Sequence, residues 1–125
     1  MSDKPAYHLD IAPFPGRVRV TWRGQTIVDT TQAIKLEEGR HTPVYYVPRG
    51  DARMELFQRA SRSTHCPHKG DASYFSLVSA DGARAESAVW SYETPIAKSA
   101  AIKEHLAFYT KDMGADFGIE VVVST

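Results

Sequence analysis

The chain has 125 residues, 42% of them hydrophobic, and its 15 basic residues balance its 15 acidic ones. This length suits a single domain with one core and leaves no room for a second domain. Because the net charge is zero, the composition predicts no basic surface for nucleic acid or anionic lipid. We therefore expect neither a nucleic-acid partner nor a membrane partner.

The only cysteine, Cys66, cannot form an internal disulfide, so the fold does not require an oxidising compartment. The first residues contain no apolar run typical of a signal peptide, and no stretch of about eighteen apolar residues occurs. We therefore expect a cytoplasmic protein. Nothing in the composition predicts its oligomeric state.

Residues 1–15 contain three prolines and little periodicity, which predicts an extended N-terminal arm beside a single β-rich domain at 16–125. From Arg17 to Arg23, valine and tryptophan alternate with polar residues, as in a strand with one wet face. Further strands are predicted at 26–29, 33–37, 42–47, 73–78, 88–92, 102–109 and 119–123.

Residues 42–47, TPVYYV, are apolar or aromatic on both faces, which predicts an interior strand. Asp51 is expected to cap a short helical stretch at 52–57, and Thr94 with Pro95 to begin another at 96–101. The pattern as a whole predicts a mainly β fold of two antiparallel sheets of short strands, or a partly open barrel. One or two short helical turns complete it.

Four segments resemble the motifs of the bacterial and fungal "domain of unknown function 427" family: TPVYYVPRGD, THCPHKGDASYF, AVWSYETP and HLAFYT. The core Cys-Pro-x-Lys-Gly-x-Ala-x-Tyr is specific to it. The resemblance implies a β-tent type of domain, in which two sheets meet at an angle around a groove. Zinc-bearing relatives of that type have paired Cys-x-x-Cys knuckles, which this chain lacks. The family's nucleotidyltransferase-like label has no support in the motifs here, because the residues for two-metal phosphoryl transfer are missing.

The stretch from His65 to Phe75 is the densest in chemistry and supplies the catalytic candidates Cys66, Lys69 and Asp71. A cation near a thiol favours the nucleophilic thiolate. His65 is a poor base for its neighbour, since adjacent strand residues point to opposite faces. The structural alternative, a thiol that packs as a small hydrophobe, is preferred. His65, Cys66 and His68 have an unusual spacing for metal ligands, so we predict no metal and no cofactor.

Lys69, next to the turn glycine Gly70, could hold an anionic group, or could instead form a structural ion pair with Asp51 or Glu93. Aromatic residues on paired strands could line a pocket for a planar ligand, or could be ordinary core. The predicted ligand-binding residues are Tyr45, Tyr46, Arg49, Asp51, His65, Lys69, Tyr74, Trp90 and Tyr92.

The preferred functional hypothesis is a non-catalytic module that binds a small planar or anionic molecule in a groove between sheets. An enzyme that uses Cys66 or Lys69 is the second hypothesis. A protein-interaction domain without a small-molecule site is the third. The sequence does not decide whether the protein is an enzyme.

Overall fold

A computed structural model of the chain describes residues 8–125. These residues form ten strands and four short 3-10 turns. In chain order they are β1 (Leu9–Pro13), β2 (Arg17–Trp22), β3 (Gln25–Thr30), β4 (Ile34–Glu38), β5 (Val44–Tyr46), η1 (Arg49–Asp51), η2 (Met54–Leu56), β6 (Phe57–Cys66), β7 (Gly70–Val78), β8 (Arg84–Ser91), η3 (Ala97–Ile102), β9 (Ala107–Phe108), η4 (Lys111–Met113) and β10 (Ile119–Ser124).

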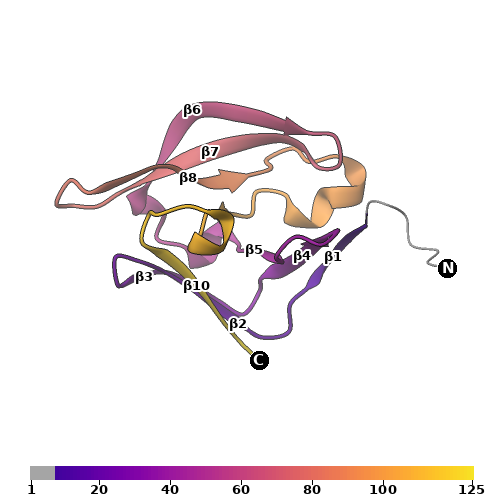
Figure 1. Cartoon of the computed structure of the whole chain (residues 1–125), viewed down its shortest axis with the longest axis horizontal. Helices are drawn as coiled ribbons and strands as arrows, with labels where there is room; N and C mark the ends of the chain where they lie inside the picture. The colour runs from indigo at the N-terminus through magenta and orange to yellow at the C-terminus, as the bar shows by residue number, and fades with distance from the viewer. Residues whose placement is uncertain (1–7) are drawn as a thin grey trace.

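The strands form three antiparallel sheets, with strand orders β1-β4-β5, β10-β2-β3 and β6-β7-β8-β9. Figure 1 shows the β6-β7-β8-β9 sheet as an upper layer, with the other two sheets lying below it. The turn η3 lies below the end of the upper layer, on the side nearest β1 and β4. The predicted mainly β architecture is confirmed.

The main core lies between the β10-β2-β3 sheet and the upper layer. Valines at alternate positions of β2, together with Ile27 and Val28 from β3, bury their side chains on one side. Phe75, Leu77, Val89 and Phe108 supply the other side. The alternation read in the sequence at 17–23 therefore corresponds to one buried and one exposed face of β2.

A second, aromatic cluster joins the β1-β4-β5 sheet to the upper layer. Its buried residues are Leu36, Tyr46, Ala72, Tyr74, Trp90, Tyr92, Ile102 and Ala107. Tyr74 lies opposite Trp90 in the ladder between β7 and β8, where paired side chains contact each other. Neighbouring residues thus serve different clusters, since Tyr74 belongs to this one and Phe75 to the main core.

The sheet count corrects one expectation, because the chain forms three sheets where the sequence predicted two. The predicted interior strand at 42–47 is also corrected: β5 is the end strand of its sheet. Both its faces are nevertheless covered, because Tyr45 packs against the main core and Tyr46 lies in the aromatic cluster. Because the two clusters bury opposite faces of β5, its sequence has the same apolar pattern as a central strand.

Helical expectations were only partly met. The predicted helix at 52–57 is replaced by η2 and the start of β6. Asp51 accepts a hydrogen bond from Thr30 Oγ1 at 2.7 Å instead of capping a helix. The predicted strand at 102–109 is reduced to β9, since η3 extends to Ile102. The aromatic and apolar residues of this segment fit the periodicity of a helix or of a strand, and the tertiary packing determined which of them formed.

The predicted N-terminal arm contributes a strand. Leu9–Pro13 pairs with β4, and Phe14 is buried in the main core. Its residues 1–7 lie outside the described residues. Trp22 is buried, as expected, and its indole Nε1 donates to the Phe117 carbonyl at 3.1 Å, which fastens the segment before β10 to β2.

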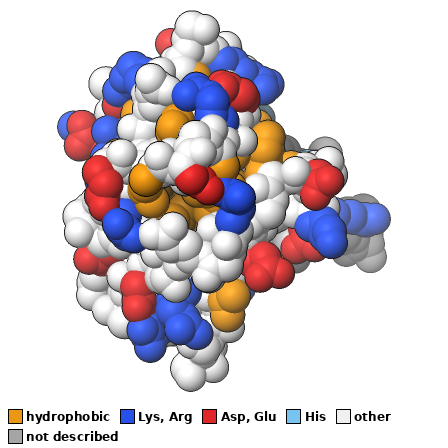
Figure 2. Space-filling model, turned by 90° about the vertical axis from the view of Figure 1, so that its left-hand side faces the viewer, with side chains coloured by type: hydrophobic (Ala, Val, Ile, Leu, Met, Phe, Trp, Pro, Cys, Tyr) orange, Lys and Arg blue, Asp and Glu red, His pale blue; other side chains and the backbone are white. Residues whose placement is uncertain are grey.

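One face of the molecule, shown in Figure 2, carries acidic and basic side chains interspersed around a recess where hydrophobic side chains reach the surface. Mixed signs of this kind produce no extended field for a polyanion on that face. None of the helical segments in the described chain has the length and apolarity needed to cross a bilayer.

The tight turn between β6 and β7 is held against the segment before η3. The amide of Ile96 donates to the Lys69 carbonyl at 2.9 Å, and Ser99 Oγ donates to the His68 carbonyl at 2.9 Å. Gly70 has a φ of +117°, and a Cβ on it would lie 3.4 Å from the Thr94 carbonyl oxygen. A glycine is therefore favoured here by the positive φ, while a separation of 3.4 Å is ordinary van der Waals contact.

Gly70→Ala should lower the free energy of unfolding by about 1–3 kcal/mol, since an alanine is strained at this φ. Gly50→Ala is the matched control, because Gly50 lies outside the left-handed region and nothing is within 4 Å of its Cβ position. Urea denaturation of both variants measures the difference. Equal midpoints for the two variants would contradict the role assigned to Gly70.

Candidate functional site

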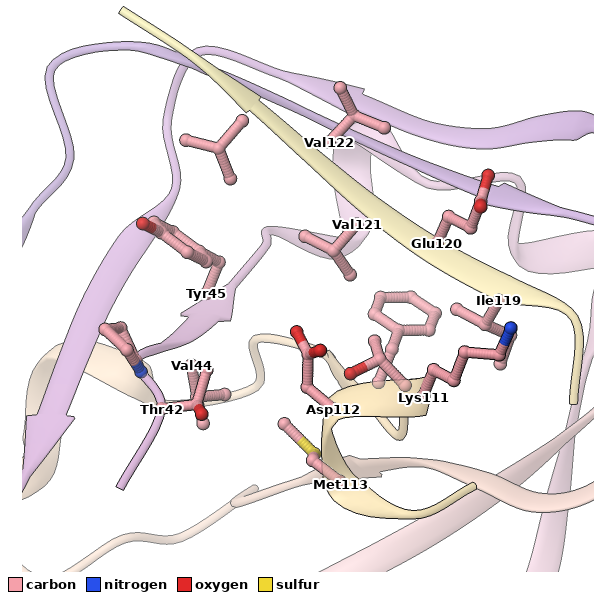
Figure 3. A pocket seen from close by; sticks show the side chains of 14 residues that line it. Thr42, Val44, Tyr45, Lys111, Asp112, Met113, Ile119, Glu120, Val121 and Val122 are labelled. Atoms are coloured by element: carbon pink, nitrogen blue, oxygen red, sulfur yellow. The ribbon is translucent and has the colours of Figure 1, made fainter. Parts of the chain in front are cut away.

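The candidate site is a cavity of about 500 Å³ between β5, η4 and β10. Figure 3 shows Tyr45 and Val44 on one side, β10 on the other, and the residues of η4 between them. The residues that line it are Thr42, Pro43, Val44, Tyr45, Phe108, Thr110, Lys111, Asp112, Met113, Ile119, Glu120, Val121, Val122 and Val123. Its volume falls within the range of small-molecule sites.

The cavity is mainly apolar, with a few polar groups at its mouth. The Tyr45 ring is fixed by an edge-on contact with Phe14, with 5.2 Å between ring centroids. Figure 3 shows Val121 and the Asp112 carboxylate directed into the space in front of Tyr45. Asp112 makes no hydrogen bond or ion pair within residues 8–125, so its charge is available to a ligand.

The aromatic residues predicted to bind ligand occupy a different place, the second cluster. Trp90 Nε1 donates to the Tyr46 hydroxyl at 3.1 Å, and the Trp90 and Tyr109 rings lie 4.6 Å apart. Tyr46 and Tyr92 have centroids 6.5 Å apart. Four of the predicted ligand-binding residues are therefore brought together, but they contact one another and are at most 9% exposed.

Buried tyrosines in this cluster stay neutral. Burial raises the pKa of Tyr46 and of Tyr92 far above the usual value, and the nearby Glu38 and Cys66 add to the effect. Burial likewise raises the pKa of Tyr109 to about 12. These hydroxyls therefore act as neutral hydrogen-bonding groups near pH 7 and not as general bases.

Lys69 is a buried structural cation. Its ammonium lies 2.6 Å from Glu38 Oε1, and its side chain is 7% exposed. The sequence had proposed Asp51 or Glu93 as its structural partner, and the structure corrects this to Glu38, at the end of β4. Glu38 is distant in sequence, so only the pairing of the sheets reveals it. The ion pair ties the β6–β7 turn to the β1-β4-β5 sheet.

Glu93 is the centre of a polar network that the sequence did not predict. Arg59 forms a bidentate pair with it at 3.1 and 2.8 Å, and Arg49 Nη2 donates to it at 3.0 Å. Ser73 Oγ donates to the same carboxylate at 2.9 Å. Both guanidinium groups also lie over the Phe75 ring, at 5.3 and 4.9 Å from its centroid.

The remaining candidates are dispersed. His65 and Asp71 face each other across the β6–β7 ladder at 2.7 Å, with both side chains more than two-thirds exposed. Cys66 is half-buried and packs against the aromatic cluster. Among the predicted ligand-binding residues only Tyr45 lines the cavity. Within the described chain, no three His, Cys, Asp or Glu side chains gather closely enough to hold a metal ion.

The model of a family described as "Domain of unknown function (DUF427)" matches residues 10–118. The chain belongs to this family. No curated protein sequence matches it. The DUF427 match contains β2 to β9, most of β1 and the four short turns, so the segments read as family motifs are now placed in the fold. They form the β6–β7 turn, the aromatic cluster and the Glu93 network.

Most of the cavity residues in this DUF427 domain were missed by the sequence reasoning. Two signals were present. Met113 is an apolar residue in an otherwise polar turn, and Val122 is apolar on the face of β10 that alternation assigns to solvent. Both are among the three exposed large hydrophobic residues of the described chain. The exposure of these two side chains marks the cavity, but only the tertiary structure shows that they are exposed.

The Glu93 network predicts a dependence of stability on acid. The arginine and serine hydrogen bonds lower the pKa of Glu93 to about 2 from an ordinary value of 4.5, with the Arg59 contact as the largest cause. A lowered folded-state pKa contributes stability above pH 4.5, and this contribution disappears as the pH falls towards 2.

Glu93→Gln should therefore lower the free energy of unfolding by about 1–3 kcal/mol at pH 7, and by progressively less below pH 4.5. Glu86→Gln, which alters an exposed ion pair with Arg84, is the control and should have little effect. Urea unfolding between pH 7 and pH 3 measures both. A constant Glu93→Gln deficit across this range would contradict the assigned network.

Proposed function

We propose that the protein is a non-catalytic binding module for a small, mainly apolar ligand, which occupies the cavity between β5, η4 and β10. The observation that carries the proposal is the cavity itself, with about 500 Å³ of space lined by Tyr45, Phe108 and valines. Such an apolar concavity with a few polar groups at its mouth is typical of ligand sites. The site lies between β5 and β10, the end strands of two sheets, and away from the predicted ligand-binding residues other than Tyr45.

The lining supports a planar ligand over an anionic one. The cations that an anionic ligand would need are engaged elsewhere, because Lys69 pairs with Glu38 and Arg49 with Glu93. In the cavity, the single ammonium of Lys111 is outnumbered by the carboxylates of Asp112 and Glu120. Flat rings can instead stack against Tyr45 and Phe108.

Val121→Phe tests the location of the site. Its side chain points into the cavity, so a phenylalanine should occupy the space and weaken binding of small neutral aromatic probes such as indole at least about tenfold. Titrations followed by ¹H–¹⁵N NMR give the affinity and the residues affected. Ile96→Phe is the matched control, since Ile96 is an exposed apolar residue that does not line the cavity, and this variant should bind indole as wild type does. Unchanged indole affinity in Val121→Phe, or absence of any binding to wild type, would refute the proposal.

The alternative, an enzyme that uses Cys66 or Lys69, makes a different prediction. In a binding module Cys66 is a packing residue beside the aromatic cluster, so iodoacetamide should alkylate it more slowly in the folded chain than in the urea-unfolded chain at pH 7.5. Mass spectrometry of timed samples gives both rates. Faster alkylation of the folded chain would favour the enzyme.

A further inference from the structure

One wall of the cavity consists of backbone. Five consecutive residues of β10, from Ile119 to Val123, line it. Successive side chains of a strand point to opposite faces, so five in a row can border one space only when the edge of the strand faces that space. The polar groups available to a ligand there are consequently the amides and carbonyls of β10.

Within the described residues, no strand pairs with this edge. β10 is the end strand of its sheet, and the Arg23 amide donates to the Gly118 carbonyl at 3.0 Å. In an antiparallel ladder, hydrogen-bonded residue pairs alternate with pairs that share no hydrogen bond. The backbone N–H and C=O groups of every second residue after Gly118 therefore face β2, and those of the residues in between face away from it. Val121 and Val123 therefore direct their N–H and C=O groups towards the cavity. No hydrogen bond in residues 8–125 uses these groups.

The opposite wall of the cavity lies where β5 and β9 diverge. Val47 and Leu106 exchange backbone hydrogen bonds of 2.9 and 2.8 Å. The same alternation would place Tyr45 opposite Phe108, yet no backbone hydrogen bond joins these two within the described residues. Their rings instead border the cavity, so the space between β10 and β5 has hydrogen-bonding groups on one side and flat apolar surface on the other.

The edge also lacks the usual protection against pairing. β10 has the sequence IEVVVS, with no proline and no lysine, and Val122 is 44% exposed. Asp112, which makes no hydrogen bond or ion pair within residues 8–125, has its carboxylate near Val121 in Figure 3. Carboxylates exceed ammonium groups two to one in the lining, which favours an occupant with a basic group.

We propose, on the basis of the function proposed above, that the ligand is a short peptide in extended conformation that adds to β10 as a further antiparallel or parallel strand. Alternate amides of the peptide bond to Val121 and Val123, apolar side chains contact Tyr45 and Phe108, and a basic side chain pairs with Asp112. Five residues of β10 span about 13 Å at ~3.3 Å per residue, so a peptide of about five residues fills the edge.

A capped pentapeptide, Val-Thr-Val-Thr-Lys, is the probe, added to the ¹⁵N-labelled full chain. Two N-methylated isomers carry the methyl groups on alternate residues. Only one set of amides can face β10, so one isomer should bind at least about tenfold more weakly than the parent peptide and the other should not. Shift changes should centre on β10 and Tyr45. Equal affinity for both isomers overturns the proposal, and so does unchanged affinity when the lysine is replaced by glutamate.

Val121→Pro is the variant on the protein side. It removes an amide that faces the cavity and leaves the ladder to β2 intact, as proline at an edge position does. Peptide binding should fall at least about tenfold. Val122→Pro, which removes an amide bonded to β2, should instead destabilise the fold. If Val121→Pro does not fold, the two N-methyl isomers still decide.

Indole distinguishes the two proposals. Binding of indole without binding of any pentapeptide overturns the peptide and leaves the binding module in place. Absence of both overturns both. Concentration-dependent dimerisation in sedimentation, with shift changes along β10 and no peptide binding, would assign the edge to a second copy and also overturn the peptide proposal.

Discussion

The hydrogen bonds to the Glu93 carboxylate are the interactions on which the arrangement of the sheets depends. This carboxylate receives hydrogen bonds from Arg49 in η1, Arg59 in β6 and Ser73 in β7, so segments far apart in sequence meet at one charge. Without it, two guanidinium groups would lie beside the same Phe75 ring with no counter-charge between them. Since η1 follows directly after β5, holding Arg49 also holds β5 against the upper layer.

The position of β5 decides what the aromatic residues can do. Tyr46 is drawn into the aromatic cluster, where it accepts the Trp90 hydrogen bond, while Tyr45 turns to the main core and the cavity. Rings that the sequence suggested as a binding surface are therefore largely used for packing. Within residues 8–125, space remains at the sheet edges, where β5 separates from Phe108 and no other strand pairs with the outer edge of β10.

An uncovered apolar edge is a risk for a folded domain, because any exposed strand can pair with it. Here the edge is recessed: η4 and the segment before β5 border the same space. A recess of this kind admits a slender ligand more readily than a second folded domain. The same recess limits unwanted pairing, although the apolar residues Met113 and Val122 are exposed.

Local features were available from the sequence alone. Alternation identified β2, β7, β8 and β10, and the Cys-Pro-x-Lys-Gly-x-Ala-x-Tyr core identified the family, because both depend on neighbouring residues. The three-sheet arrangement, the Glu38 partner of Lys69 and the cavity were decided by the tertiary structure. Each depends on contacts between residues distant in sequence, and an unpaired strand edge has no signature in side-chain pattern. The sequence therefore determined the strands and their family, and the packing of the sheets determined where a cavity remains.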